Sequence, residues 1–341
     1  MMRKLFIVLF GILPAVWFTA CNYTGPPGGG TGVPAGEGQS AVEESPGGQE
    51  NQDSQGGGAR QVLRDRSFQK GFNLLGLNSA VDGATVYKKI RYGSVVGAPQ
   101  WQLAQWRSKY DLKYGQESST VGRYALKDQS KTFAVDLSAY DLTLGVDAEY
   151  EFASANLAAP ASWPHLLIEQ TADDGYWLGL ARSVNAKVRF TIDKAEDKRG
   201  TNEGFHAQFA WFVYIVDKNT ESPGYGNFLW FGLNIYDSTK EFAGRHASQD
   251  LAGGPGNFIY SVGAEEFMDG AIETGREYAV DFDILPRIKE ALPLAQSRGF
   301  MTGSNFNDLR ITGTNIGWEV FDRWNVAVTI HELGIGFAPS A

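Results

Sequence analysis

Residues 205–216, FHAQFAWFVYIV, decide the fold class of this chain. Aromatic and β-branched residues crowd this stretch, and such residues favour a strand that is buried on both faces. A second stretch, residues 228–237, FLWFGLNIYD, alternates between two faces with the period of a strand. Leu229, Phe231, Leu233 and Ile235 share one face, and Trp230, Asn234 and Tyr236 share the other. The two stretches predict long neighbouring strands of a large sheet.

Further strands are predicted outward from this pair, and only one segment has the period of a helix. The strands are expected at 146–152, 163–170, 186–193, 258–262, 277–284, 308–320 and 324–332. In 285–292, Leu285, Ile288 and Leu292 fall on one helical face, and Pro293 is expected to end or kink the helix at Leu292. Many strands with one short helix predict an all-β fold, a two-sheet antiparallel β-sandwich of the jelly-roll type.

The first residues have the features of an export signal. Arg3 and Lys4 precede a short apolar run at 5–18, which is typical of a secretory signal peptide. The following Phe18-Thr19-Ala20-Cys21 resembles the lipobox of bacterial lipoproteins. The resemblance implies cleavage before Cys21, the only cysteine, and lipidation of its thiol. We therefore expect residues 1–20 to be a signal peptide and the protein to be lipid-anchored in a bacterial cell envelope, facing the periplasm or the cell exterior.

Between the anchor and the strands the composition changes sharply. Residues 21–60 are rich in glycine, proline and glutamate, and they offer almost nothing for a core. Such a segment cannot offset its ordering entropy, so a disordered linker is expected there. The β-sandwich domain is then expected at 61–341.

The charge balance excludes one class of partner. The chain has 30 basic and 39 acidic residues, and no basic cluster interrupts this excess. Nucleic acid is therefore not an expected partner.

Carboxylates are the candidate catalytic groups, since the usual serine, cysteine and zinc motifs are missing from the sequence. Glycoside hydrolysis needs two carboxyl groups, about 5–5.5 Å or about 6.5–9.5 Å apart. Glu149 and Glu151 alternate on the strand expected at 146–152, while Glu169 and Glu319 are isolated candidates on other strands. A solvent-facing strand surface would explain the first two equally well.

Aromatic and amide side chains are the candidate ligand-binding groups. Trp230, Asn234 and Tyr236 are expected on one strand face, where they could stack on a sugar ring and bond its hydroxyls. Gly232 would leave a gap between Trp230 and Asn234 that a sugar ring could enter. The alternative is that Trp230 only packs within the protein.

These stretches, with residues 311–319 (ITGTNIGWE), resemble the jelly-roll carbohydrate-recognition and concanavalin-like domains of exported bacterial proteins. The resemblance implies a β-sandwich and a polysaccharide or oligosaccharide ligand, and it supplies no catalytic residue. The first hypothesis is a membrane-anchored lipoprotein that binds a carbohydrate. The alternatives are a glycoside hydrolase that uses two of the glutamates, and a structural envelope protein without a ligand.

No cofactor is expected from the sequence. A structural calcium ion is possible in a sandwich of this kind, with Asp237, Asp250 and Asn257 as available oxygen ligands.

Overall fold

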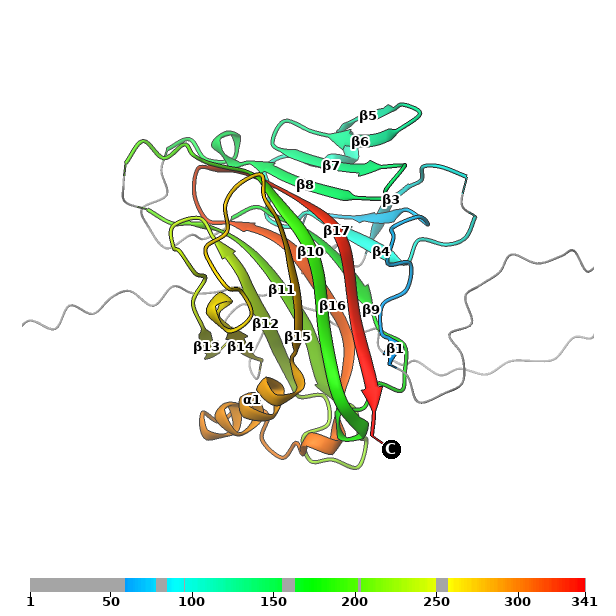
Figure 1. The fold of residues 1–341 in the computed structure, drawn as a ribbon, viewed down its shortest axis with the longest axis vertical. Helices are drawn as coiled ribbons and strands as arrows, with labels where there is room; N and C mark the ends of the chain where they lie inside the picture. The colour runs from blue at the N-terminus through cyan, green and yellow to red at the C-terminus, as the bar shows by residue number, and fades with distance from the viewer. Residues whose placement is uncertain are drawn as a thin grey trace, which may run out of the picture.

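The computed structural model describes residues 59–77, 85–94, 96–154, 163–201, 204–249 and 257–340. Two large sheets stack face to face over a common core (Figure 1). The predicted two-sheet sandwich is confirmed. Cys21 and most of the expected linker lie outside the described residues, so their assignments stay predictions.

The first sheet has eight strands in the described part of the chain. In spatial order they are β15 (Glu277–Asp283), β10 (Ala181–Asp197), β17 (Trp324–Pro339), β8 (Leu142–Asp147), β7 (Lys131–Asp136), β6 (Arg123–Lys127) and β5 (Gln116–Ser119), with β1 (Arg60–Gln61) paired to β17. This sheet is called the eight-stranded sheet below.

The second sheet has nine strands among the described residues. In spatial order they are β13 (His246–Gln249), β14 (Phe258–Val262), β12 (Phe228–Asp237), β11 (Ala207–Asp217), β16 (Leu309–Val320), β9 (His165–Thr171), β4 (Trp101–Ala104), β2 (Phe72–Leu75) and β3 (Val86–Ile90). Two of its pairs, β12 with β14 and β2 with β4, are parallel, which the sequence prediction of an antiparallel fold did not include.

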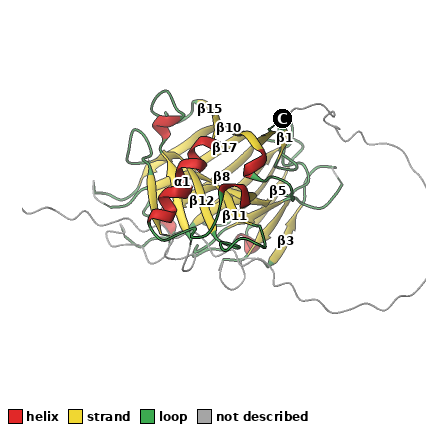
Figure 2. Cartoon of the chain, turned by 90° about the horizontal axis from the view of Figure 1, so that it is seen from below, coloured by secondary structure: helices red, strands yellow, loops and turns green. Residues whose placement is uncertain are grey.

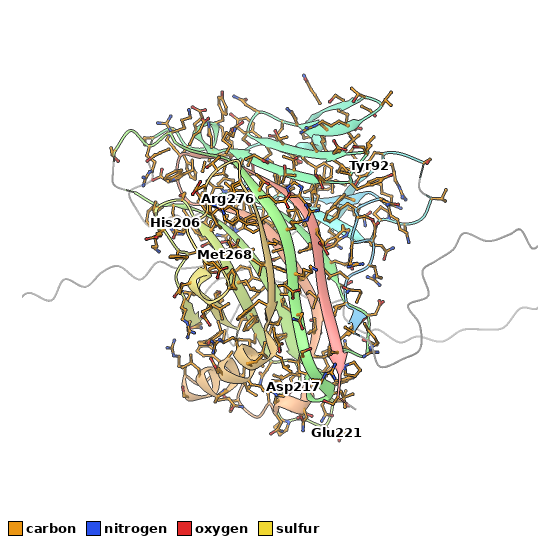
Figure 3. All side chains as sticks on the ribbon, viewed as in Figure 1. Tyr92, His206, Asp217, Glu221, Met268 and Arg276 are labelled. Carbon is orange, nitrogen blue, oxygen red and sulfur yellow. The ribbon has the colours of Figure 1, made fainter. Side chains whose placement is uncertain are left out.

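The core lies between the sheets, and the alternation of β11 shows how it is filled. Phe209, Trp211 and Val213 point into the core. The indole of Trp211 donates a hydrogen bond of 2.7 Å to the hydroxyl of Thr314 on β16, so its polar atom is satisfied inside the sandwich. Figure 3 labels Asp217, the last residue of β11, and His206, which directly precedes the strand. Ala210, Phe212 and Tyr214 of the same strand belong to a separate buried cluster, on the outer face of the nine-stranded sheet.

The one α-helix among the described residues, α1 (Leu285–Ser297), is longer than predicted. Pro293 was expected to end or kink the helix at Leu292, and the helix continues through Pro293 to Ser297. Pro293 has no backbone N–H, so the carbonyl of Lys289 lacks its usual helical hydrogen bond. Both residues lie on the exposed side of the helix, where water can replace that bond. Buried Leu292 and Ala295 hold the last turns against the protein.

Helix α1 lies across one end of the sandwich (Figure 2). Short 3₁₀ helices complete the fold: η1 (Leu112–Tyr114), η2 (Ala148–Tyr150), η3 (Leu178–Leu180), η4 (Ala264–Glu266) and η5 (Phe306–Asp308). None of the helices in the described ranges is both long and apolar enough to pass through a bilayer.

Candidate functional site

A line of mostly polar residues crosses the outer face of the nine-stranded sheet at right angles to its strands. Strand register places one residue of each strand in this line. From β13 to β3 the members of this polar row are His246, Ser261, Gly232, Phe212, Asn315, Glu169, Gln102, Asn73 and Lys89. At about 4.8 Å between strands, the polar row is about 38 Å long.

Access to solvent is concentrated in one half of the polar row. Glu169, Gln102 and Asn73 are half-buried, and Lys89 at the end is exposed. The side-chain amides of Gln102 and Asn73 are not engaged by any other described residue, so they are available to a ligand. An amide offers both donors and acceptors, as the hydroxyls of a sugar do.

Glu169 is the carboxyl group at the centre of the polar row. Its neighbours in the row are Asn315 on β16 and Gln102 on β4. Burial raises the pKa of Glu169 to about 7, opposed by a hydrogen bond of 3.5 Å from the hydroxyl of Tyr214. The carboxyl is therefore close to half-protonated at neutral pH and can both donate and accept hydrogen bonds.

Asn315 carries an unmet hydrogen-bonding atom beside this carboxyl. The side chain is only 5% exposed, and its Oδ1 has no partner within the described structure. An orphaned acceptor of this kind costs about 1–3 kcal/mol when buried. A ligand hydroxyl or a bound water in the row would recover that energy.

Aromatic rings border the polar row on one side. Trp230 and Tyr214 pack edge to face, with ring centroids 4.8 Å apart. The Tyr214 ring lies over Gly313 of β16, where a Cβ would come within 2.8 Å of ring carbon Cδ2. Trp230 is 2% exposed, and its indole nitrogen has no partner in the described structure. This border therefore offers a buried N–H donor more than an open ring face.

On the other side of the polar row, apolar side chains lie next to it, and polar side chains follow further along the strands. Leu75, Ala104, Trp106 and Leu167 form a buried cluster there. Beyond them, Glu319 of β16 accepts a hydrogen bond of 3.1 Å from Gln208 of β11.

His165 faces the same carboxylate, with Nε2 3.9 Å from a carboxylate oxygen of Glu319. Burial, with Arg107 as the second cause, lowers the pKa of His165 to about 3, so the ring is neutral. Its Nδ1 lies 3.0 Å from the carbonyl of Trp163, which can only accept, so the single proton resides on Nδ1. Nε2 is therefore an unpartnered acceptor turned toward Glu319.

The two predicted glutamates share this face, yet they do not form a hydrolase pair. Glu169 lies opposite Asn315, which is four residues from Glu319 along β16. At about 3.3 Å per residue this offset is about 13 Å, beyond the range for inverting or retaining enzymes. Asp237, two strands from Glu319, is engaged at the end of β12 by Thr239 and Lys240.

Glu149 and Glu151 are not on this face, and the strand predicted to carry them is wrong beyond Asp147. The chain turns into η2 there, and the two carboxylates have separate partners. The carboxylate of Glu149 accepts from the amide of Asn325, and that of Glu151 accepts from Ser108. The prediction failed because residues 148–150 form a 3₁₀ helix, in which side chains no longer alternate between two faces as they do in a strand.

The predicted grouping of Trp230, Asn234 and Tyr236 is also wrong in part. A β-bulge at Ile235 shifts the register, so Tyr236 points into the core and meets Trp318 edge-on at 6.1 Å. Asn234 stays on the outer face, where its amide donates to the carbonyl of Gly244 at 2.7 Å.

The expected gap at Gly232 is filled by the protein itself. A Cβ there would meet the Ser261 side chain and would lie 2.7 Å from ring carbon Cε1 of Phe212. A sugar ring therefore cannot enter at this position. Ligand-binding roles for Trp230 and Asn234 stay predictions.

Asn73, Gln102 and Asn315 were not singled out as candidate site residues from the sequence. Gln102 lies in residues 99–106, whose two tryptophans and three glutamines are compatible with a strand beside a glycan groove and equally with an edge strand that closes the core. The signal in the first two is a single amide between two core residues, in Phe72-Asn73-Leu74 and Trp101-Gln102-Leu103. That signal predicts an outward-facing amide, but it does not reveal which strands are neighbours or in which register they pair.

A metal site finds no support among the described residues, which contain no group of three or more histidine, cysteine, aspartate or glutamate side chains suited to an ion. Asp250, one of the expected calcium ligands, lies outside the described residues. The calcium site stays a prediction.

Comparison with known proteins finds similarity to solved structures only. No protein-family model matches the sequence, and no curated protein matches it. A family 12 xyloglucanase from Bacillus licheniformis is 12% identical with a TM-score of 0.39, over 65% of this chain and 97% of that one. A metagenome-derived family 12 endoglucanase is 11% identical with a TM-score of 0.35, over 70% and 99%. These similarities concern the fold, and the activities of those enzymes are not transferred to this chain.

Proposed function

We propose that this protein binds a neutral polysaccharide along the polar row. The observation that carries the proposal is the set of unengaged polar groups around Glu169. Asn315 has an orphaned buried oxygen, and Gln102 and Asn73 have free amides. These groups lie in register on four adjacent strands, so they suit an extended ligand with a hydroxyl at each step.

The ligand is proposed to be neutral because the chain has a formal net charge of −9. A polyanion would be repelled by this charge. The part of the polar row from Asn315 to Lys89 covers four strand spacings, or about 19 Å. That length suits an oligosaccharide segment better than a single sugar.

The location is part of the same proposal. The lipobox-like sequence ending at Cys21 would place the sandwich on a bacterial membrane, in the periplasm or outside the cell. Cys21→Ser is expected to move the protein from the membrane pellet to the soluble fraction. A variant that stays in the pellet would overturn the anchor and leave the binding proposal intact.

Binding is tested by affinity electrophoresis of the full-length protein in gels that contain xyloglucan, mixed-linkage glucan or hydroxyethylcellulose. Retardation by at least one of them is expected. Gln102→Ala and Asn315→Ala should each weaken it about fivefold to tenfold, as expected for one hydrogen bond. Asn185→Ala is the matched control, because Asn185 is an amide on the eight-stranded sheet.

Two results would overturn the binding proposal. One is the absence of retardation by any of the three polysaccharides. The other is equal retardation of the wild type, Gln102→Ala and Asn315→Ala proteins. Recovery of a protein partner together with no glycan affinity would favour the structural role.

Glycoside hydrolysis is the second candidate, and one observation favours it. A carboxyl group with a pKa of about 7 is suited to general acid catalysis at neutral pH, and Glu169 is such a group. The separation of about 13 Å between Glu169 and Glu319 argues against hydrolysis by this pair, because it exceeds the range for inverting and retaining enzymes. Reducing-sugar release that is lost in Glu169→Gln would establish hydrolysis, while inactivity of the wild type on the same polysaccharides would exclude it there.

A further inference from the structure

A pocket lies at the loop that follows β4, and none of the residues that line it belongs to the polar row. Its volume is about 830 Å³, which is within the range of small-ligand sites. Lys109, Tyr110, Tyr114 and Lys127 line it together with Asp111 and Asp128.

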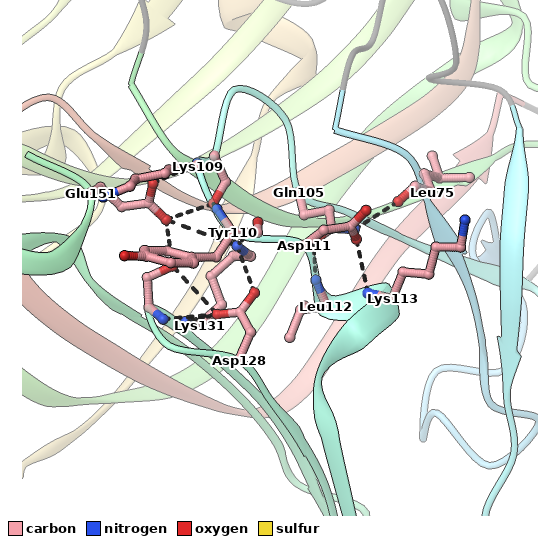
Figure 4. A network of polar contacts seen from close by, with 12 residues as sticks. Leu75, Gln105, Lys109, Tyr110, Asp111, Leu112, Lys113, Asp128, Lys131 and Glu151 are labelled. Atoms are coloured by element: carbon pink, nitrogen blue, oxygen red, sulfur yellow. Dashed lines mark hydrogen bonds and ion pairs between the residues drawn. The ribbon is translucent and has the colours of Figure 1, made fainter.

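The acidic groups of this pocket are already used by the protein. Asp128 pairs with the fully buried ammonium of Lys131 at 2.9 Å. Asp111 accepts hydrogen bonds from the Gln105 amide and the Lys113 backbone, at 2.7 and 2.8 Å. Figure 4 shows this network, and it makes both carboxylates part of the pocket's framework.

The same network holds the pocket wall in place. Lys131 also donates to the hydroxyl of Ser108 and to the carbonyl of Tyr110, each at 2.5 Å. The carboxylate of Glu151 accepts from the backbone N–H of Lys109 at 2.6 Å. The loop that carries Lys109 and Tyr110 is therefore tied to the turn between β6 and β7, and the pocket is formed before any ligand arrives.

The basic groups, in contrast, are available. Lys109 and Lys127 are exposed, and neither forms an ion pair within the described structure. The Lys109 ammonium lies 5.0 Å from the centroid of the Tyr110 ring, a contact that leaves its charge uncompensated. Tyr114 adds an aromatic ring that is 80% exposed. The Lys113 ammonium lies 5.5 Å from the centroid of this ring. An exposed ring with two ammonium groups that form no ion pair provides a stacking surface for an apolar face and a charge for an anion.

We propose that this pocket binds a sugar unit that carries a carboxylate, such as a uronic acid residue. The ring of the sugar packs on Tyr114, and its carboxylate meets Lys109 and Lys127. A single acidic unit is compatible with the acidic chain, because the two lysines act locally, whereas a long polyanion would be repelled. The site is independent of the polar row.

Two disaccharides that differ in one group provide the test: cellobiose and cellobiouronic acid. Calorimetric titration of the full-length protein at pH 7 and low salt should show at least tenfold tighter binding of the acid. Lys109→Gln/Lys127→Gln should abolish this preference, and raising the salt concentration should reduce it. Tyr114→Ala should weaken the binding of both sugars.

Lys218→Gln/Lys289→Gln is the matched control, because it removes the same charge at lysines that do not line this pocket. It should retain the preference for the acid. Equal affinity for the two sugars, or an unchanged preference in Lys109→Gln/Lys127→Gln, would overturn the proposal. Glu169→Gln should leave the preference unchanged, so failure of the polar-row proposal and failure of this one are distinguishable.

Discussion

Glu169→Gln should make the stability of the protein less dependent on pH. The pKa of this carboxyl rises from 4.5 to about 7 on folding, chiefly through burial. Between these values the folded protein retains a proton that the unfolded chain has released, so the free energy of unfolding falls as pH rises. At about 1.4 kcal/mol per unit, the full loss is about 3 kcal/mol.

The variant lacks the titrating group and should lose this penalty. Relative to the wild type, its free energy of unfolding should increase by about 3 kcal/mol from pH 4 to pH 8, with most of the change between pH 5 and 7. Urea unfolding at several pH values measures the difference, and any constant offset reports the lost contact with Tyr214. Glu241→Gln, at an exposed position, supplies the baseline. A difference between Glu169→Gln and the wild type that stays flat over this range would refute the burial argument.

Three further changes test other parts of the structure. Lys131→Met should lower the free energy of unfolding by about 3–5 kcal/mol, because it leaves the buried carboxylates of Asp128 and Glu151 without their cation. Chemical denaturation measures this loss, and a clearly smaller value would show that the network is dispensable. Pro293→Ala should raise the melting temperature, since it restores the helical hydrogen bond to the carbonyl of Lys289. An unchanged or lower melting temperature would contradict this prediction. Gly317→Ala should destabilise the folded protein by about 1–3 kcal/mol, because the added Cβ would collide with the backbone of Leu166. Thermal unfolding measures this change, and a neutral effect would show that β9 can move aside.

Local sequence pattern was sufficient for much of the fold. The bounds predicted for residues 228–237 and 258–262 are those of β12 and β14, because aromatic and β-branched residues specify a strand without help from distant segments. It was not sufficient where local rules compete. The η2 turn replaced the end of a predicted strand, and α1 passed through Pro293 because tertiary packing of Ala295 outweighed the missing hydrogen bond.

The candidate site shows the same division more sharply. The sequence alone determined that Glu169 and Glu319 were carboxylates on strands and that Trp230 alternated with core residues. Only the tertiary structure decided that Glu169 stands beside Asn315 and Gln102, that about 13 Å separates it from Glu319, and that a bulge turns Tyr236 inward. The physical reason is that side-chain alternation is a property of one strand, whereas register depends on pairing between strands that are distant in the chain.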